Sequence, residues 1–142
     1  MKIVKIDAYA IKVGERADEK ASTREGIDEY GDYFIDRDAW TSIYSRHHET
    51  ALVRLETDNG IVGWGEAQAP VSGRAVRAII EDLCAPVLMA RDPFDVEYLW
   101  YRMYSSMRER GHITGFFVDA IGGVDLALYD LLGKALDKPA HR

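Results

Sequence analysis

The chain has 142 residues, 47% of them hydrophobic, and its 24 acidic side chains outnumber its 18 basic ones, giving a net charge of −6. This length predicts one domain with a buried core, and the hydrophobic content excludes an intrinsically disordered chain. The negative charge leaves no broad basic surface for phosphate groups, which argues against nucleic-acid binding. The single cysteine, Cys84, excludes an internal disulfide. Because the segment after Met1 also lacks the apolar core of a signal peptide, we expect a cytoplasmic protein.

Three segments have the alternating pattern of half-buried strands. Residues 2–13 place Val4, Ile6, Ala8 and Ala10 on one face. Residues 50–57 and 61–67 flank Asp58-Asn59-Gly60, which predicts a hairpin with a tight turn. Gly63 and Gly65 would lie on one face of the last strand and allow a neighbouring backbone to approach closely.

The connection between the first two strands is long and acidic. Residues 14–48 show no periodicity and carry nine acidic and five basic side chains. A connection of this length without secondary structure is typical of a functional lid or a disordered segment. Its five aromatic residues favour ordering against another surface.

Three helices are predicted in the second half of the chain. Ser72 is expected to cap the first helix, which Pro86 should limit, and Asp92-Pro93 should start the second. The third helix, residues 117–136, should end before Pro139. The apolar faces of the three helices are expected at Val76, Ile79, Ile80, Leu83 and Cys84; at Val96, Leu99, Trp100, Met103 and Met107; and at Phe117, Ile121, Val124, Leu128, Leu131 and Ala135.

These elements predict an α+β fold over residues 1–142: a three-stranded antiparallel meander followed by a bundle of about three helices. In such a meander, the connection 14–49 and the segment 66–72 converge at the same edge of the sheet, where we expect the functional site. The helix 117–136 is apolar enough to lie between two layers. We expect one side to pack on the other helices and the second side to meet a partner, since only three residues follow Pro139.

Three segments resemble a known family when they are taken in this order. They are residues 53–66 (VRLETDNGIVGWGE), 90–94 (ARDPF) and 120–135 (AIGGVDLALYDLLGKA). They resemble the N-terminal capping domain of the mandelate racemase and muconate lactonizing enzyme group of the enolase superfamily. The resemblance covers nearly the whole chain and implies the enolase N-terminal domain-like form of the α+β fold.

The resemblance also implies a function. In this group the cap closes over a following (β/α) barrel, which binds Mg²⁺ through three carboxylates and removes a proton next to the substrate carboxylate. The length of the 14–49 connection is similar to that in acid-sugar dehydratases, so we expect the capping domain of a Mg²⁺-dependent dehydratase, a lyase; racemases and isomerases are the group's other enzymes. Because the implied catalytic and metal-binding residues belong to the barrel, which this chain lacks, we assign none here and expect the chain alone to be inactive.

Four residues of the acidic connection are candidates for facing the substrate, namely Tyr33, Trp40, Arg46 and His48. Aromatic rings exclude water, arginine can bind a carboxylate through two hydrogen bonds, and imidazole suits hydroxyls and carboxylates. Each could equally belong to an ordinary surface loop held by its aromatic residues. His47 and His48 point to opposite faces of a strand, so we predict no metal site there.

Other readings of the sequence stay open at this point. Glu66, at the end of a strand, could make a structural hydrogen bond or act as a general base, with the structural role favoured. The whole chain could be a binding or self-assembly module without catalysis, or an α+β enzyme with its site in residues 14–49. The expected partners are a barrel domain or another copy, through the face of helix 117–136, and a small molecule with a carboxylate, such as a sugar acid.

Overall fold

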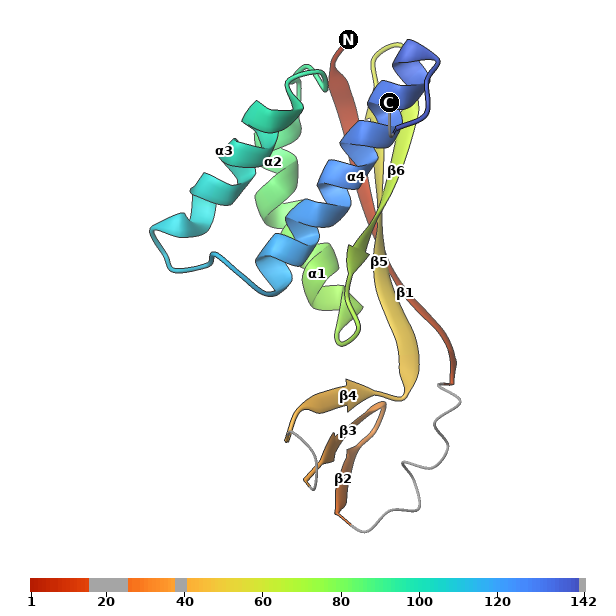
Figure 1. Cartoon of the computed structure of the whole chain (residues 1–142), viewed down its shortest axis with the longest axis vertical. Helices are drawn as coiled ribbons and strands as arrows, with labels where there is room; N and C mark the ends of the chain where they lie inside the picture. The colour runs from red at the N-terminus through yellow and green to blue at the C-terminus, as the bar shows by residue number, and fades with distance from the viewer. Residues whose placement is uncertain (16–25, 38–40, 141–142) are drawn as a thin grey trace.

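The computed structural model describes residues 1–15, 26–37 and 41–140, and it has two sheets and a group of helices (Figure 1). The main sheet has the strand order β1-β5-β6 and is antiparallel throughout, which confirms the predicted meander and the α+β class. The strands are β1 (Ile3–Glu15), β2 (Ile27–Tyr30), β3 (Tyr33–Asp36), β4 (Ile43–Ser45), β5 (His47–Thr57) and β6 (Val62–Gln68). The helices are α1 (Gly73–Ile79), the π-helical segment η2 (Ile80–Cys84), α2 (Ala85–Leu88), α3 (Val96–Arg108) and α4 (Phe116–Leu136).

The prediction of a connection without secondary structure is wrong for its described part. Strands β2, β3 and β4 form a second antiparallel sheet, here called the small sheet. Gly31, with φ 64°, makes the tight turn between Tyr30 and Tyr33, and the rings of Phe34 and Tyr44 stack across β3 and β4 at 5.4 Å. The small sheet lies at one end of the main sheet, away from most of the helices (Figure 1).

At the start of β1, one residue departs from the predicted inward face. Val4 is 47% exposed, whereas Ile3 is fully buried. The pairing of β1 with β5 is irregular between Ile3 and Lys5, which shifts the alternation of side chains at this point. Ala8 follows the prediction and is buried.

The first helical segment differs from the prediction at both ends. Ser72 stands before α1 with φ 57° and makes no capping hydrogen bond through its side chain. The chain also continues in a helical path beyond Pro86, because η2 widens the helix just before the proline, which then lies in the first turn of α2. Cys84 is buried in this region as predicted, and its burial raises the pKa of the thiol to about 12.

The second helix begins three residues later than predicted. Asp92 accepts a hydrogen bond from the Phe94 N–H at 3.0 Å, which holds residues 92–94 in a turn, and α3 then starts at Val96. Trp100, predicted to be buried, is 36% exposed and stacks on Tyr104. In the ranges that the structure describes, no helix is both long enough and apolar enough to cross a membrane.

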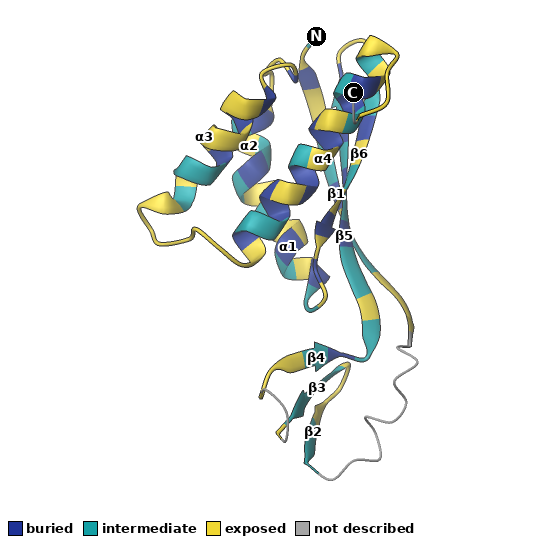
Figure 2. Ribbon diagram, viewed as in Figure 1, coloured by how far each residue is buried: buried dark blue, intermediate teal, exposed yellow. Residues whose placement is uncertain are grey.

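Helix α4 lies between the other helices and strand β6 (Figure 1). Phe117 and Leu128 are buried and Leu132 is half-buried within the chain itself. Figure 2 shows how buried, half-buried and exposed residues follow one another along α4. Strand β6 covers part of the second side of this helix, while Leu126 and Tyr129 stay exposed, so the expected partner at this face remains a prediction. The helix ends at Asp137, with φ 53°, two residues before Pro139.

Glycines on both elements allow this close packing. A Cβ atom at Gly65 would lie 2.6 Å from the backbone nitrogen of Ala127, and one at Gly63 would lie 2.7 Å from the Cβ of Leu131. On α4, a Cβ at Gly123 would lie 2.6 Å from the Cβ of Ala67. These spacings confirm that the glycines of β6 admit a neighbouring backbone.

Side chains of α4 also protect the open edge of the main sheet. Asp130 accepts a hydrogen bond from the Trp64 N–H at 2.8 Å, and Lys134 donates one to the Val62 carbonyl at 2.9 Å. Asp130 and Lys134 are themselves paired at 2.6 Å. Since β6 is an edge strand, these contacts satisfy backbone groups that could otherwise pair with another chain.

Replacing Asp130 by alanine is expected to lower the free energy of unfolding by about 1–2 kcal/mol, since it removes an acceptor from a strand N–H and the partner of Lys134. Urea denaturation measures the change. Glu81→Ala is the matched control: it breaks the ion pair between Arg77 and Glu81, which has the same spacing and a similar exposure but joins two residues of the α1–η2 segment. That control should cost at most about 0.5 kcal/mol, and equal losses in the two variants would contradict the edge role of Asp130.

Candidate functional site

The expected site edge forms where the ends of the main strands meet the start of α1. The end of β1, the start of β5 and the end of β6 lie together, and the small sheet adjoins them (Figure 1). The Thr50 hydroxyl on β5 lies 2.8 Å from the Glu66 carboxylate and 3.1 Å from the Ala67 carbonyl, and its single proton is shared between these two acceptors. The convergence predicted from the topology is thus present.

Glu49 is the most highly connected side chain at this edge. Its carboxylate accepts hydrogen bonds from the Ser45 hydroxyl at 2.6 Å and from the Gly73 N–H, at the start of α1, at 3.1 Å. Lys12 Nζ lies 3.4 Å away, and the Tyr33 hydroxyl is 3.5 Å away. The Glu49 side chain is only 4% exposed.

The environment of Glu49 favours the ionised carboxylate. Its burial acts to raise the pKa, but the hydrogen bonds from Ser45 and Gly73 and the charge of Lys12 outweigh burial, so the pKa lies below its ordinary value. A carboxylate with this many donors is strongly held in place.

A hollow of about 340 Å³ opens beside Glu49. It is lined by Glu49, Thr50, Glu66, Gln68, Ala69, Pro70 and Leu126. The lining has two carboxylates and no lysine or arginine. Its chemistry therefore suits a ligand with hydrogen-bond donors such as hydroxyl groups and disfavours a ligand carboxylate. Glu66 accepts a hydrogen bond from Thr50, which is the kind of structural contact predicted for a glutamate at a strand end.

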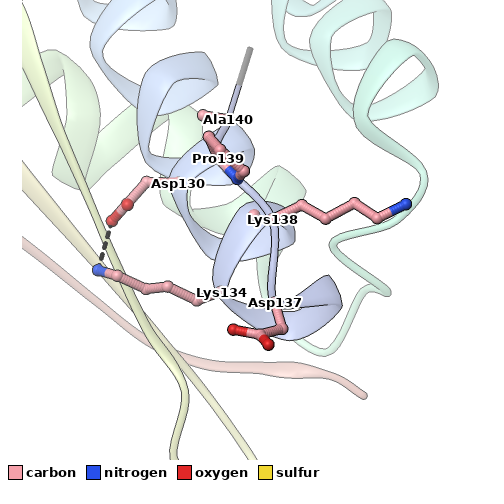
Figure 3. Close-up of a pocket in the computed structure, with 7 residues that line it drawn as sticks. Asp130, Lys134, Asp137, Lys138, Pro139 and Ala140 are labelled. Atoms are coloured by element: carbon pink, nitrogen blue, oxygen red, sulfur yellow. Dashed lines mark hydrogen bonds and ion pairs between the residues drawn. The ribbon is translucent and has the colours of Figure 1, made fainter. Parts of the chain in front are cut away.

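A second hollow, of about 350 Å³, lies at the C-terminal end of α4 (Figure 3). Asp130 and Lys134 line it, and Figure 3 shows them paired with one another. Because both side chains also bind β6, their polar groups are already used in holding the fold together. We therefore place the candidate site at the first hollow, where Glu66 and Gln68 are exposed.

The four predicted substrate-facing residues have different surroundings. Tyr33 lies beside Glu49, with Lys12 Nζ 5.2 Å from the centre of its ring. Arg46 is paired with Glu29 at 2.5 Å and lies over the Phe34 ring, so its guanidinium is engaged within the small sheet. His48 is exposed on β5 opposite Val13. Trp40 lies outside the described residues.

The two adjacent histidines do not gather metal ligands. His47 Nδ1 lies 2.8 Å from the Gly14 carbonyl oxygen, and its Nε2 lies 3.6 Å from Asp32. Searching residues 1–15, 26–37 and 41–140 finds no group of three or more His, Cys, Asp or Glu side chains that could hold a metal ion. The described residues therefore do not fit the Mg²⁺ that the family resemblance implies.

Glu49 and Lys12 were missed as site residues in the sequence. A signal for Glu49 was present, because positions 51, 53 and 55 of the same strand are buried and the alternation carries a glutamate onto that inward face. An inward carboxylate needs donors, and the Gly73 N–H supplies one of them. Lys12 had no comparable signal, because it lies opposite Glu49 on the neighbouring strand and its other contacts cross to the small sheet.

Comparison with known proteins identifies relatives of this domain. Residues 32–142 match the family described as mandelate racemase / muconate lactonizing enzyme, N-terminal domain. The chain is 42% identical over 91 residues to the D-galactonate dehydratase of Verminephrobacter eiseniae, a match that covers 64% of this chain and 23% of that protein. It is 36% identical over 105 residues to the D-xylonate dehydratase of Haloferax volcanii, covering 74% of this chain and 24% of that protein.

Among solved structures, the chain is similar to a member of the enolase superfamily from Agrobacterium tumefaciens. The TM-score is 0.89 and the identity is 31%, with 98% of this chain and 36% of that chain covered. The chain therefore spans about a quarter of the length of the two dehydratases and about a third of this structural relative.

Proposed function

The chain belongs to the mandelate racemase / muconate lactonizing enzyme family of the enolase superfamily, as its N-terminal domain, and on that premise we propose that it caps the active site of an acid-sugar dehydratase. The hollow lined by Glu66, Thr50 and Gln68 is the observation that carries the proposal. Two similar proteins named as sugar-acid dehydratases support the substrate class.

The charge of the hollow orients such a substrate. A sugar acid has a carboxylate at one end and hydroxyl groups along its chain. The carboxylate of Glu66 repels the acid group and accepts hydrogen bonds from hydroxyls, whereas both oxygens of Glu49 are already hydrogen-bonded within the domain. The hydroxyl-bearing end would therefore face the cap, and the carboxylate would point away from it.

This orientation places the chemistry outside the domain. Dehydration of a sugar acid removes a proton from the carbon next to the carboxylate and releases the hydroxyl of the following carbon as water. Both carbons lie at the acid end, away from the hollow. We therefore assign no catalytic residue and no metal-dependent step to this chain.

The four residues predicted to face the substrate are still proposed to do so. Tyr33 is well placed beside Glu49 to border the substrate, and His48 is exposed on the adjoining strand. Arg46 would first have to leave Glu29. Trp40 belongs to the same connection between β1 and β5.

We also propose that a barrel domain, in the cytoplasm, completes the enzyme and packs against the exposed part of α4 and β6. Leu126 and Tyr129 of α4 are 55% and 42% exposed, and Trp64 of β6 is 44% exposed. Exposed apolar residues of this size favour an interface. A second copy of the chain would be the other occupant, and a stable dimer of the isolated chain in light scattering would support it.

The Glu66→Gln variant of the complete enzyme tests the orientation of the substrate. Glutamine keeps one acceptor oxygen but loses the charge, so we expect the KM for a long-chain sugar acid to rise about tenfold while kcat changes less than about twofold. The exposed Glu97→Gln on α3, remote from the hollow, is the control. A large fall in kcat with unchanged KM would contradict the proposal, because Glu66 would then act on the reacting carbons.

A further inference from the structure

The described part of the small sheet contributes no residue to the apolar core of the domain. None of the hydrophobic residues in the described ranges 26–37 and 41–45 belongs to the core or packs against it. Burial in the apolar core therefore does not hold this sheet in place, so its attachment relies on the chain connection from β4 to β5 and on polar contacts.

These polar contacts converge on one carboxylate. Glu49 on β5 accepts the hydroxyl hydrogens of Ser45 on β4 and Tyr33 on β3, so it bonds two strands of the small sheet. It also accepts the Gly73 N–H of α1 and pairs with Lys12 of β1. A single side chain thus connects the small sheet to two elements of the main body.

A second contact reinforces the first. Lys12 reaches past Glu49 to Asp32, in the turn between β2 and β3, at 2.8 Å. The Arg46 N–H donates to the Asp32 carbonyl at 2.9 Å, which holds that turn against the start of β5. Lys12 and Asp32 are more exposed than Glu49, with 33%, 58% and 4% of their side chains accessible, so solvent weakens their pair more.

We propose that Glu49 is a positioning residue, which fixes the small sheet to α1 and β1 and thereby sets where Tyr33 lies relative to the hollow. The link to substrate binding rests on the proposed capping function. The attachment itself does not, because the contacts are present in the chain alone. The Glu49 side chain acts through the sheet that it holds and takes no part in the reaction.

Glu49→Gln is the sharpest variant for this role. A carboxylate has two acceptor oxygens, whereas glutamine has one acceptor oxygen and an NH₂ group that donates. The Gly73 N–H and the Ser45 hydroxyl bind different oxygens of Glu49, so glutamine cannot accept from both, and Lys12 loses its charge partner. Asp28→Asn is the matched control, because Asp28 pairs with Arg37 within the small sheet.

The first measurement is amide hydrogen exchange on the 142-residue chain. In Glu49→Gln, we expect the Gly73 amide and the amides of β3 to exchange about tenfold faster, with residues 51–55 of β5 unchanged. In Asp28→Asn, the Gly73 amide should exchange as in the wild type. Equal exchange of the Gly73 and β3 amides in Glu49→Gln and the control would overturn the proposal.

The second measurement is kinetic and uses the complete enzyme. Glu49→Gln should raise the KM for the sugar acid about tenfold and leave kcat within about twofold, since binding is disturbed and the reacting groups are not. Faster amide exchange with an unchanged KM would overturn the link between the attachment through Glu49 and substrate binding. If the wild-type enzyme turned over no sugar acid, the proposed function would fail, while the exchange data would still decide the role of Glu49.

A milder variant covers the case in which Glu49→Gln does not fold. Ser45→Ala removes the shortest hydrogen bond to Glu49 and leaves the carboxylate and Lys12 in place. It should speed exchange of the β3 amides about threefold. If the β3 amides of a folded Ser45→Ala variant exchanged as in the wild type, this would count against the attachment of the small sheet through Glu49.

Discussion

Gly65→Ala should lower the free energy of unfolding by about 3 kcal/mol, which is the upper end of the usual cost of overpacking. The added Cβ would lie 2.6 Å from the Ala127 nitrogen and would also overlap the Gly123 carbonyl oxygen. Both neighbours are backbone atoms of α4, so no side chain can turn away to relieve the overlap. The helix and β6 would have to separate, and with them the wall that carries Leu126 beside the hollow.

Two neighbouring glycines of α4 provide the control. A Cβ at Gly122 would meet nothing within 4 Å, so Gly122→Ala should raise stability by about 0.5–1 kcal/mol through the better helix propensity of alanine. Gly123→Ala, one residue further along, should lower it because its Cβ would press on Ala67. Urea denaturation measures the order of stability of the three variants. A Gly65→Ala variant as stable as the wild type would refute the close packing of α4 on β6.

The main sheet and the long helix could be predicted from the sequence because their patterns are local. The hairpin depends on Asp58-Asn59-Gly60, and the close contact of α4 depends on glycines whose spacing is visible in the sequence. The packing of β6 on one side of α4 was not predicted from the apolar residues of the helix. Apolar periodicity shows that a helix face is buried but does not show what buries it.

The small sheet was harder to predict, because its strands are three or four residues long and do not alternate clearly. Its stability comes from pairing across strands and from cross-strand contacts such as Phe34 with Tyr44. The anchoring of this sheet likewise depends on residues far apart in sequence, from Lys12 to Gly73. Such contacts have no signature in the spacing of residues along the chain.

The candidate site was likewise predicted only in part. Topology alone placed Glu66 and the start of the first helix at one edge, where Thr50 and Glu66 now meet. Of the residues chosen by type, Tyr33 lies at that edge, whereas Arg46 is occupied by Glu29. Residue type suggests what a side chain can bind, but only the fold shows whether its polar groups are already paired.

The second large effect is an all-or-none difference in activity. If this domain supplies only the cap, the purified 142-residue chain should convert no sugar acid, even with Mg²⁺ present. The complete enzyme that contains it should convert at least one member of a panel of sugar acids to the dehydrated keto acid. The reason is the proposed orientation of the substrate at Glu66, which would place the reacting carbons beyond the reach of the cap.

The most direct test of this account is therefore a side-by-side assay of the chain and the complete enzyme for release of the keto-acid product from a panel of sugar acids with Mg²⁺. The capping role predicts product only from the complete enzyme, with a KM that rises in Glu66→Gln. Product formed by the 142-residue chain alone would contradict it, because the catalytic groups would then lie within this domain.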